Sequence, residues 1–181
     1  SLKRIATSEN NNNVIKEYVK GDAAIICINN DRNWVLSTLM QELKKAAEWQ
    51  EFKKANRKLY LDVLVIKQEI KATKLIKFLN QNRRIVIVIT RRFLAEDDCL
   101  KSLYIIHETM KNQSKESVLI IMVDPIAWNG LPSILQSLIA EKNFIQFPIE
   151  KEHRQLIYFW EAVRNELLRR GNVFETKMQI G

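Results

Sequence analysis

The sequence predicts an α/β domain in which helices flank a doubly wound, five-stranded parallel sheet. Three observations carry this prediction. The unbroken β-branched run Ile85–Ile89 is typical of a strand that is buried on both faces. Other apolar runs alternate with segments of helical periodicity, which indicates right-handed β-α crossovers. With 3 prolines and 4 glycines in 181 residues, the chain is poor in the turn residues that an all-β fold needs.

The length of 181 residues suits one domain. Residues 1–17 are polar and include four consecutive asparagines, so we expect a flexible tail or the end of a linker there. Residues 18–171 are expected to form the domain, and residues 172–181 a C-terminal tail. No stretch is apolar over the length of a signal peptide or a membrane span. Cys27 and Cys99 lack the spacing of a metal or redox motif, which favours a reducing, intracellular compartment.

The first strand is predicted at Asp22–Ile28, and the residues that follow, Asn29–Asp31, have turn and N-cap chemistry. From Trp34 to Ala47, apolar residues recur at helical spacing and predict an amphipathic helix. The next apolar run, Leu59–Ile66, has two interpretations. It is either one long strand, or a strand that stops near Leu61 and continues as an exposed apolar loop, which would mark an interaction surface.

Three more strands are predicted beyond this run, again alternating with helices. A helix over Ile70–Leu79 precedes the central strand, and a third helical region covers Phe93–Met110. The acidic residues Glu96–Asp98 suit the positive end of a helix dipole. The remaining elements are predicted as a strand at Ser117–Val123, a helix at Leu131–Ile139 with Pro132 in its first turn, an edge strand at Asn143–Pro148 and a last helix at Glu152–Arg170.

Folds of this class bind ligands at the loops that leave the carboxyl ends of the strands. The first such loop, Asn29–Arg32, has no glycine, which argues against a dinucleotide-binding or P-loop enzyme. The central strand ends in Thr90–Arg92 and not in the carboxylate that a phosphoacceptor receiver needs. His107 and His153 lie far apart in sequence, and neither has a second imidazole or a cysteine at ligand spacing. The sequence therefore predicts neither a cofactor nor a metal site.

The formal charge of +8 favours acidic partners: nucleic acid, anionic lipid or an acidic protein surface. However, the basic residues are spread along the chain and never form a block of five. We therefore expect no nucleic-acid partner. A basic module that docks on anionic membrane lipid remains an alternative function.

Three short motifs, in order, resemble those of Toll/interleukin-1 receptor (TIR) domains, and the resemblance covers nearly everything from Tyr18 to Arg170. Gly21–Cys27 is similar to the first box of the family. Arg83–Thr90, followed by Phe93–Leu94, is similar to its central strand. Phe159–Trp160 stands where the third box opens the last helix, and we expect these two residues to be core anchors.

The resemblance implies a flavodoxin-like sheet with strand order 2-1-3-4-5. It also implies a cytoplasmic signalling module of innate immunity in the Toll pathway, as a receptor domain or an adaptor. Such a module would act by weak association with other TIR domains. The asparagine-rich leader mildly favours an adaptor that has further modules upstream.

The segment after the second strand departs from the family pattern. Family members commonly carry Arg-Asp-x-x-Pro-Gly there, and the myeloid differentiation adaptor has Asp-Val-Leu-Pro-Gly. This chain keeps Asp-Val-Leu at Asp62–Leu64 but continues with Val65 and Ile66. The loss of Pro-Gly removes a preset φ and a residue that tolerates positive φ, so either the loop is reshaped or the strand is longer.

A second departure lies in the third helical region. TIR domains that cleave NAD resemble one another in a Cys-x-x-Glu motif whose carboxylate is catalytic. Here Cys99 is followed by Ser102 at that position, and Glu96–Asp98 are expected to face elsewhere. The resemblance thus implies a module that is not an enzyme, and an NAD hydrolase with a displaced carboxylate is the alternative. The candidate partner-binding residues are Asp62, Val63, Leu64, Val65, Ile66, Lys67, Glu96, Asp97, Asp98, Cys99, Lys101 and Ser102.

Overall fold

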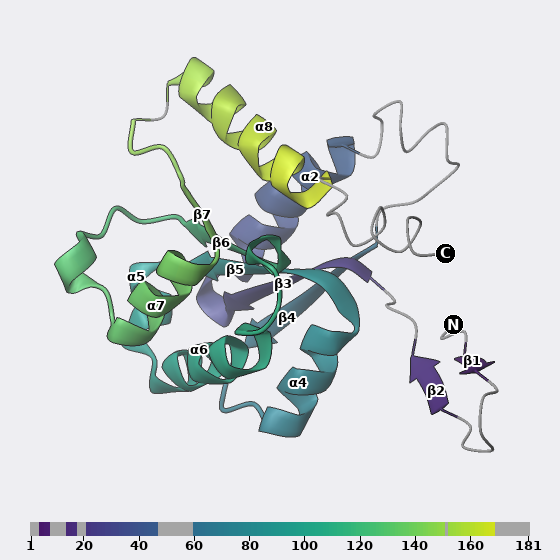
Figure 1. Cartoon of the computed structure of the whole chain (residues 1–181). Helices are drawn as coiled ribbons and strands as arrows, with labels where there is room; N and C mark the ends of the chain where they lie inside the picture. Colours follow the sequence, from purple (N-terminus) through teal and green to yellow (C-terminus); the bar gives the residue numbers. More distant parts are fainter. Residues whose placement is uncertain (1–3, 8–13, 18–20, 47–59, 151, 169–181) are drawn as a thin grey trace.

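The computed structural model describes residues 4–7, 14–17, 21–46, 60–150 and 152–168. Its main body is a five-stranded parallel sheet with helices on both faces (Figure 1). The strand order, β4-β3-β5-β6-β7, is the predicted order 2-1-3-4-5 and confirms the fold class. The strands are β3 (Gly21–Ile28), β4 (Leu61–Ile66), β5 (Asn82–Ile89), β6 (Val118–Met122) and β7 (Asn143–Gln146).

The helices form two layers. One layer begins with a continuous helical stretch whose middle is a π-helix: η1 (Asn29–Asp31), α1 (Arg32–Trp34), η2 (Val35–Leu39) and α2 (Met40–Ala46). The long helix α8 (His153–Leu168) completes this layer. The other layer is made of α4 (Ala72–Asn80), α5 (Arg91–Ala95), α6 (Asp97–Met110) and α7 (Ser133–Glu141). Two short turns, η3 (Lys115–Ser117) and η4 (Trp128–Gly130), flank β6.

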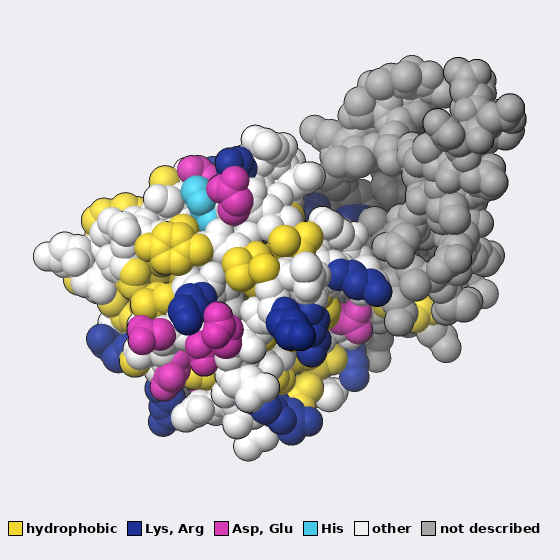
Figure 2. Space-filling view, turned by 90° about the horizontal axis from the view of Figure 1, so that it is seen from below, with side chains coloured by type: hydrophobic (Ala, Val, Ile, Leu, Met, Phe, Trp, Pro, Cys, Tyr) yellow, Lys and Arg dark blue, Asp and Glu magenta, His cyan; other side chains and the backbone are white. Residues whose placement is uncertain are grey.

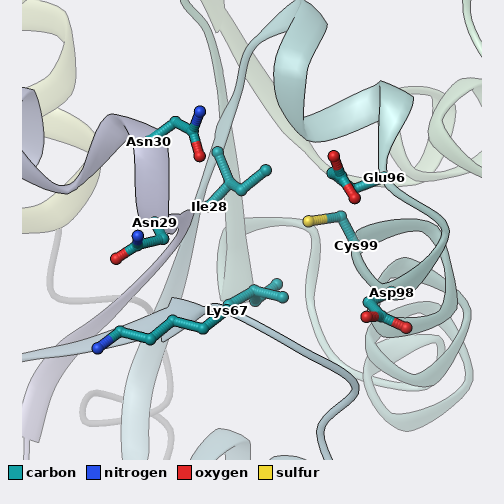
Figure 3. A pocket seen from close by; sticks show the side chains of 8 residues that line it. Ile28, Asn29, Asn30, Lys67, Glu96, Asp98 and Cys99 are labelled. Atoms are coloured by element: carbon teal, nitrogen blue, oxygen red, sulfur yellow. The ribbon is translucent and has the colours of Figure 1, made fainter.

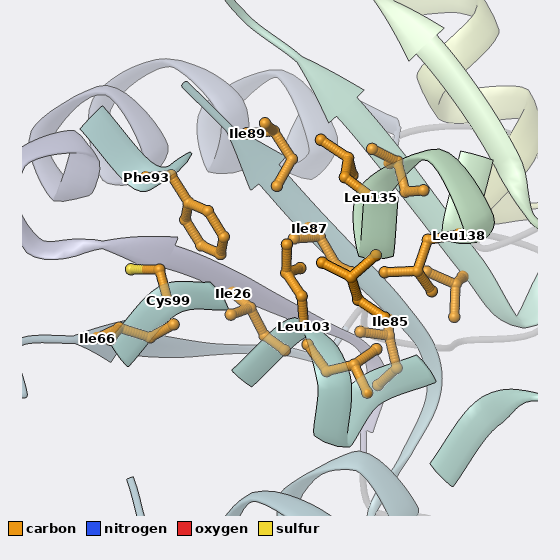
Figure 4. Close-up of a cluster of buried hydrophobic side chains, with 14 of the residues drawn as sticks. Ile26, Ile66, Ile85, Ile87, Ile89, Phe93, Cys99, Leu103, Leu135 and Leu138 are labelled. Carbon is orange, nitrogen blue, oxygen red and sulfur yellow. The ribbon is translucent and has the colours of Figure 1, made fainter. Parts of the chain in front are cut away.

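The central strand β5 divides the core into two clusters. Its isoleucines, among them Ile85 and Ile87, join the cluster under α4, α6 and α7 (Figure 4). Val86 and Val88 join the cluster under α2 and α8. Because both faces of β5 are buried, the strand needs no polar alternation, as the sequence predicted.

The structure settles the open question about β4. Every residue from Leu61 to Ile66 lies in the strand, which pairs with β3 as far as Ile28 opposite Ile66. Ile66 is 2% exposed and lies in the core (Figure 4). The interpretation of Val63–Ile66 as an exposed loop is therefore wrong. The two β-branched residues Val65 and Ile66 extend the strand at the point where Pro-Gly would turn the chain.

The third helical region is split. Glu96 has extended φ and ψ angles of −100° and 123° and separates α5 from α6. The other predicted helices and strands are present with shifted ends; Pro132, for example, is the N-cap of α7 and does not lie in its first turn. The predicted end of the last helix at Gly171 lies outside the described residues.

A second, two-stranded sheet lies near the N-terminus. Its strands β1 (Arg4–Thr7) and β2 (Val14–Glu17) pair antiparallel. The sequence predicted a flexible tail for residues 1–17 and did not predict the pairing of β1 with β2. The main sheet begins at Gly21 and α8 ends at Leu168, within the predicted range 18–171, whereas the predicted tail 172–181 lies outside the described residues.

Phe159 and Trp160 of α8 are core anchors, as predicted. Both are buried, and their ring centroids lie 4.8 Å apart. Phe147, after β7, packs against Phe159 at 4.9 Å, and Trp34 of α1 stacks on Trp160 at 6.4 Å. This aromatic cluster packs the helical stretch after β3, the segment after β7 and α8 together on one face of the sheet.

Candidate functional site at the carboxyl edge of the sheet

A pocket of about 220 Å³ opens where β3 and β4 end. This is the switch point of the sheet, where the chain leaves β3 for β4 on one side and later returns to β5 on the other. Three lining residues, Ile28, Ile66 and Cys99, are buried and form its floor. Its rim is polar and consists of Asn29, Asn30, Lys67, Glu96 and Asp98 (Figure 3).

The strand register explains how these residues meet. Ile28 pairs with Ile66, so β3 and β4 end at the same level and their following residues share one edge. The break at Glu96 then brings the start of α6 to the opposite wall. Figure 3 shows Glu96, Asp98 and Cys99 on this wall, facing Asn29 and Asn30. The side chain of Lys67 extends away from the two carboxylates (Figure 3).

A hydrogen bond between strand ends holds the two walls together. The Thr90 hydroxyl donates to the Asp31 carboxylate at 2.6 Å and accepts the N–H of Phe93 at 3.2 Å. Thr90 is therefore the N-cap of α5 and also the tie to the segment after β3. Asp31 was expected to contribute N-cap chemistry to the helix after β3, but its side chain makes no such bond, because it bonds Thr90 of the neighbouring strand.

Neither cysteine is an activated nucleophile. Burial, and to a smaller extent the nearby carboxylates of Glu96 and Asp98, raise the pKa of the Cys99 thiol to about 12. The pKa of Cys27 is likewise raised to about 12, mainly by burial and then by Asp31. Both thiols stay protonated at neutral pH, and a protonated thiol is a poor nucleophile.

Ser102 does not line the pocket. It is buried, and its hydroxyl donates to the backbone carbonyl of Asp98 at 3.0 Å, within its own helix. In contrast, Glu96 and Asp98 do line the pocket, so their side chains lie apart from that of Ser102. The reason is the extended backbone at Glu96, which changes the direction of the side chains at the start of α6.

The structure separates the predicted partner-binding residues by accessibility. An exposed ion pair between Lys101 of α6 and Glu69, at 3.6 Å, joins the segment after β4 to the helix. The exposed candidates are Lys67, Glu96, Asp97 and Lys101. Asp62, Val63, Leu64, Val65 and Asp98 are half-buried, while Ile66, Cys99 and Ser102 are buried and cannot touch a partner in the folded domain.

The sequence did not single out Trp128, which lies on the η4 turn after β6 and is 54% exposed. Several hydrogen bonds hold this turn. The Arg91 guanidinium donates to the carbonyl of Pro125 at 2.5 Å, and the Gln136 amide donates to the carbonyl of Trp128 at 2.7 Å. The available signal was an aromatic residue between Pro125 and Gly130, where turn chemistry predicts surface exposure.

Other kinds of site find no support in the described part of the chain. Its His, Cys, Asp and Glu residues form no group of three that could hold a metal ion. None of its helices is both long and apolar enough to cross a membrane. On the face shown in Figure 2, acidic and basic side chains are mixed, with apolar patches between them.

Comparison with known proteins identifies the family. The sequence profile of the TIR domain matches residues 26–129. Mouse Toll-like receptor 6 is 27% identical over 93 residues, covering 50% of this chain and 11% of the receptor. Human Toll-like receptor 1 is also 27% identical over 93 residues, covering 50% and 12%, respectively. Chicken Toll-like receptor 2 type-2 is 20% identical over 149 residues, covering 81% of this chain and 18% of the receptor. The matches thus span less than a fifth of these relatives' length.

Solved structures agree on the fold. The TIR domain of the Toll-related receptor TRR-2 from Hydra magnipapillata superposes with a TM-score of 0.50 at 18% identity, covering 82% of this chain and 99% of that one. A diflavin flavoprotein from Nostoc also reaches 0.50, at 11% identity and 82% and 92% coverage, which reflects the shared flavodoxin-like architecture. Because the profile matches more than half of the chain, the chain belongs to the TIR domain family, a family of signal-transduction domains.

Proposed function

We propose that this TIR domain is a signalling module of innate immunity that is not an enzyme. It acts in the cytoplasm, as a receptor domain or an adaptor, by associating with other TIR domains. The observation that supports the absence of enzymatic activity most directly concerns Ser102. Where the resemblance to NAD-cleaving TIR domains requires a carboxylate, this chain has a buried hydroxyl that is bonded to its own helix at 3.0 Å. The similarity to Toll-like receptors supports the same function.

The exposed residues at the carboxyl edge form the proposed contact surface: Lys67, Glu96, Asp97 and Lys101, with Asp62–Val65 and Asp98 half-buried beside them. Exposed ion pairs contribute about 0–1 kcal/mol each, so a surface of this kind binds weakly. Clustering compensates for weak binding, because it raises the local concentration of the domains. The module would therefore respond to the clustering of its receptors.

The direct test is complex formation with another TIR domain. We expect the purified chain to sediment together with the aligned TIR region of human Toll-like receptor 1. The fraction of protein in the complex should rise with concentration and fall as salt is added. The control is a flavodoxin, which has the same architecture but is not a TIR domain. Equal binding to both proteins, or binding to neither, would contradict the proposal.

One observation favours a second candidate, an NAD hydrolase with a displaced catalytic carboxylate. Glu96 and Asp98 both line the pocket. Against it, the pocket's 220 Å³ is below the roughly 300–1,000 Å³ of typical small-molecule sites. We expect no nicotinamide release when the concentrated chain is incubated with NAD. Release that is lost in Glu96→Gln or Asp98→Asn would establish the enzyme instead.

A further inference from the structure

We propose that the η4 turn docks this domain on an anionic lipid bilayer, with Trp128 in the headgroup layer and with Arg91 and Arg92 of α5 bound to the phosphates of the surrounding lipids. This inference goes beyond the proposed function, because docking on lipid needs no second TIR domain. It assigns a partner to the loop after β6, which belongs neither to the pocket nor to the proposed contact surface.

The η4 turn holds an aromatic side chain on a projection of the surface. Trp128 is 54% exposed, and its turn stands out at the left edge of the molecule in Figure 1. The carbonyl of Trp128 accepts the N–H of Leu131 at 3.1 Å and the Gln136 amide at 2.7 Å, so the turn is fixed before any partner binds. Tryptophan is enriched at membrane–water interfaces, because its ring is apolar while its N–H is polar.

Two cations lie at the same edge of the sheet. The neighbouring parallel strands β5 and β6 lead into α5 and into the η4 loop, so both segments leave the carboxyl end. Arg91 and Arg92 are exposed, and the Arg91 guanidinium donates to the carbonyl of Pro125, three residues before Trp128, at 2.5 Å. Among the described residues, neither guanidinium has a carboxylate within ion-pair distance. Arginine binds phosphate oxygens well, because its planar group presents several donors.

The η4 loop carries no charge that an anionic surface would repel. From Pro125 to Ala140, the sequence contains neither an acidic nor a basic residue. Asp124 precedes this stretch, and its carboxylate accepts the backbone N–H of Arg91 at 2.8 Å, which ties it to the start of α5. An exposed indole, an uncharged loop and two arginines together complement a surface of anionic headgroups.

The exposed acidic residues of neighbouring loops determine how the domain approaches the lipid. Glu96 and Asp97 lie between α5 and α6 and at the start of α6, and Glu150 and Glu152 lie before α8. A broad contact of this edge with the bilayer would bring these carboxylates against anionic lipid. Because the η4 turn projects (Figure 1), a contact through its tip keeps them at a distance. We therefore expect shallow, weak docking.

Shape and charge favour a bilayer over a nucleic acid or an acidic protein. A headgroup layer deforms around a convex turn, whereas a protein partner needs a groove that matches it. A nucleic-acid site uses a row of basic residues along the phosphate backbone, and this loop offers two arginines. The cytoplasmic leaflet is rich in anionic lipid, and it is the surface that a cytoplasmic signalling domain encounters.

Vesicle binding tests the inference. The purified chain is sedimented with large vesicles of phosphatidylcholine that contain about a third phosphatidylserine, and with vesicles of phosphatidylcholine alone. Lipid up to about 10 mM covers an apparent Kd of about 1 mM. Trp128→Ala removes the indole, and Arg91→Gln/Arg92→Gln removes the two charges. Thermal unfolding confirms that each variant is folded, and Arg92→Gln alone, which keeps the bond from Arg91 to Pro125, replaces the pair if the pair unfolds.

Each variant has a matched control outside the loop. Tyr104→Ala removes an aromatic side chain of α6 that is 58% exposed. Lys111→Gln/Lys115→Gln removes two exposed charges that lie after α6 and in η3, before β6 begins. A second measurement uses brominated lipid, which quenches the fluorescence of a tryptophan that enters the bilayer. Quenching should be seen in the unmodified chain and lost in Trp128→Phe.

We expect the unmodified chain to bind anionic vesicles, with affinity that falls as salt is added, and to bind neutral vesicles much less. Trp128→Ala and Arg91→Gln/Arg92→Gln should each weaken binding at least about fivefold, and the controls less than about twofold. Binding of Trp128→Ala like the unmodified chain, an equal loss in the two charge pairs, quenching that persists in Trp128→Phe, or an unmodified chain that never binds would each overturn the inference. Binding to the Toll-like receptor 1 region, measured without lipid, tests the proposed function separately.

Discussion

The two ends of the sheet use polar residues in opposite ways. At the amino end, two charged side chains are buried and bonded within the chain. The ammonium group of Lys142, just before β7, donates to the backbone carbonyls of Met110, Gln113 and Ser114 at 2.7, 2.9 and 3.1 Å. The buried Asp22 carboxylate accepts the N–H of Tyr60 at 2.9 Å. These two groups stabilise the fold and are not available to a partner.

At the carboxyl end, polar residues surround a pocket and a projecting turn, and most of them are exposed. Lys67, Glu96 and Arg92 are accessible to solvent, and Trp128 is exposed in the loop that follows β6. The comparison shows that the buried charges at the amino end contribute to stability, whereas the exposed charges around the pocket at the carboxyl end are available for recognition. Substitutions at the two ends should therefore change different properties.

The largest effect on stability is expected at the border between core and surface. Ile66→Glu places an unpaired charge where Ile66 is 2% exposed, and should lower the free energy of unfolding by about 4 kcal/mol or more. Lys67→Glu, one residue further on and exposed, should change it by less than about 0.5 kcal/mol. Urea denaturation measures both values. Equal stability of the two variants would mean that β4 ends before Ile66.

The next effect concerns the amino end. Lys142→Met leaves the buried carbonyl of Met110 and the half-buried carbonyls of Gln113 and Ser114 without their donor, which should destabilise the domain by about 3 kcal/mol. The control is Lys111→Met, which removes only an exposed ion pair with Glu108 at 2.6 Å and should cost less than about 1 kcal/mol. Both variants should bind other TIR domains as the unmodified chain does, when measured well below their unfolding midpoints. A loss of binding in folded Lys142→Met would contradict the claim that the buried groups at the amino end act on stability and not on recognition.

A smaller effect is expected at the tie between the pocket walls. Thr90→Val removes both the N-cap of α5 and the bond to Asp31, for a loss of about 1–2 kcal/mol. Because the tie also positions the walls, association should weaken in the same variant. Thr73→Val on the exposed face of α4 is the matched control and should alter neither property. Normal association of Thr90→Val would show that the tie is structural only.

The smallest change is expected from thiol reagents. With pKa values of about 12, Cys27 and Cys99 have about one thiolate in ten thousand molecules at pH 8, and both are buried. The native chain should react with an aromatic disulfide reagent far more slowly than the chain in guanidinium chloride. Fast reaction of Cys99 in the native chain would mean that the pocket floor opens to solvent.

Much of the fold follows from the sequence because its signals are unambiguous. The run Ile85–Ile89 fits a strand buried on both faces and little else, and the alternation of apolar and helical segments then predicts a doubly wound sheet, whose strand order the family resemblance implied. The end of β4 was ambiguous because Val65 and Ile66 suit both a strand and an apolar loop. The pairing of β1 with β2 was missed because the polar composition around the asparagine run indicates disorder.

The site was less predictable, for two physical reasons. A single extended residue, Glu96, changes the direction of the following side chains, and helical periodicity does not reveal such a break. The burial of Lys142 is also invisible in the sequence, because its carbonyl partners come from a distant loop. By contrast, Ser102, at the position where the resemblance to NAD-cleaving TIR domains implies a carboxylate, was visible in the motif, and the structure adds that the hydroxyl is buried and bonded to Asp98.

The most direct test compares two charge-matched double variants for binding to the TIR region of human Toll-like receptor 1. Lys67→Glu/Lys101→Glu changes the carboxyl end, and Lys111→Glu/Lys115→Glu changes exposed lysines at the other end by the same net charge. We predict a loss of affinity of at least about tenfold, or about 1.4 kcal/mol, for the first pair and less than about twofold for the second. Equal losses would show that only net charge matters, and a larger loss in the second pair would contradict the assignment of recognition to the carboxyl end of the sheet.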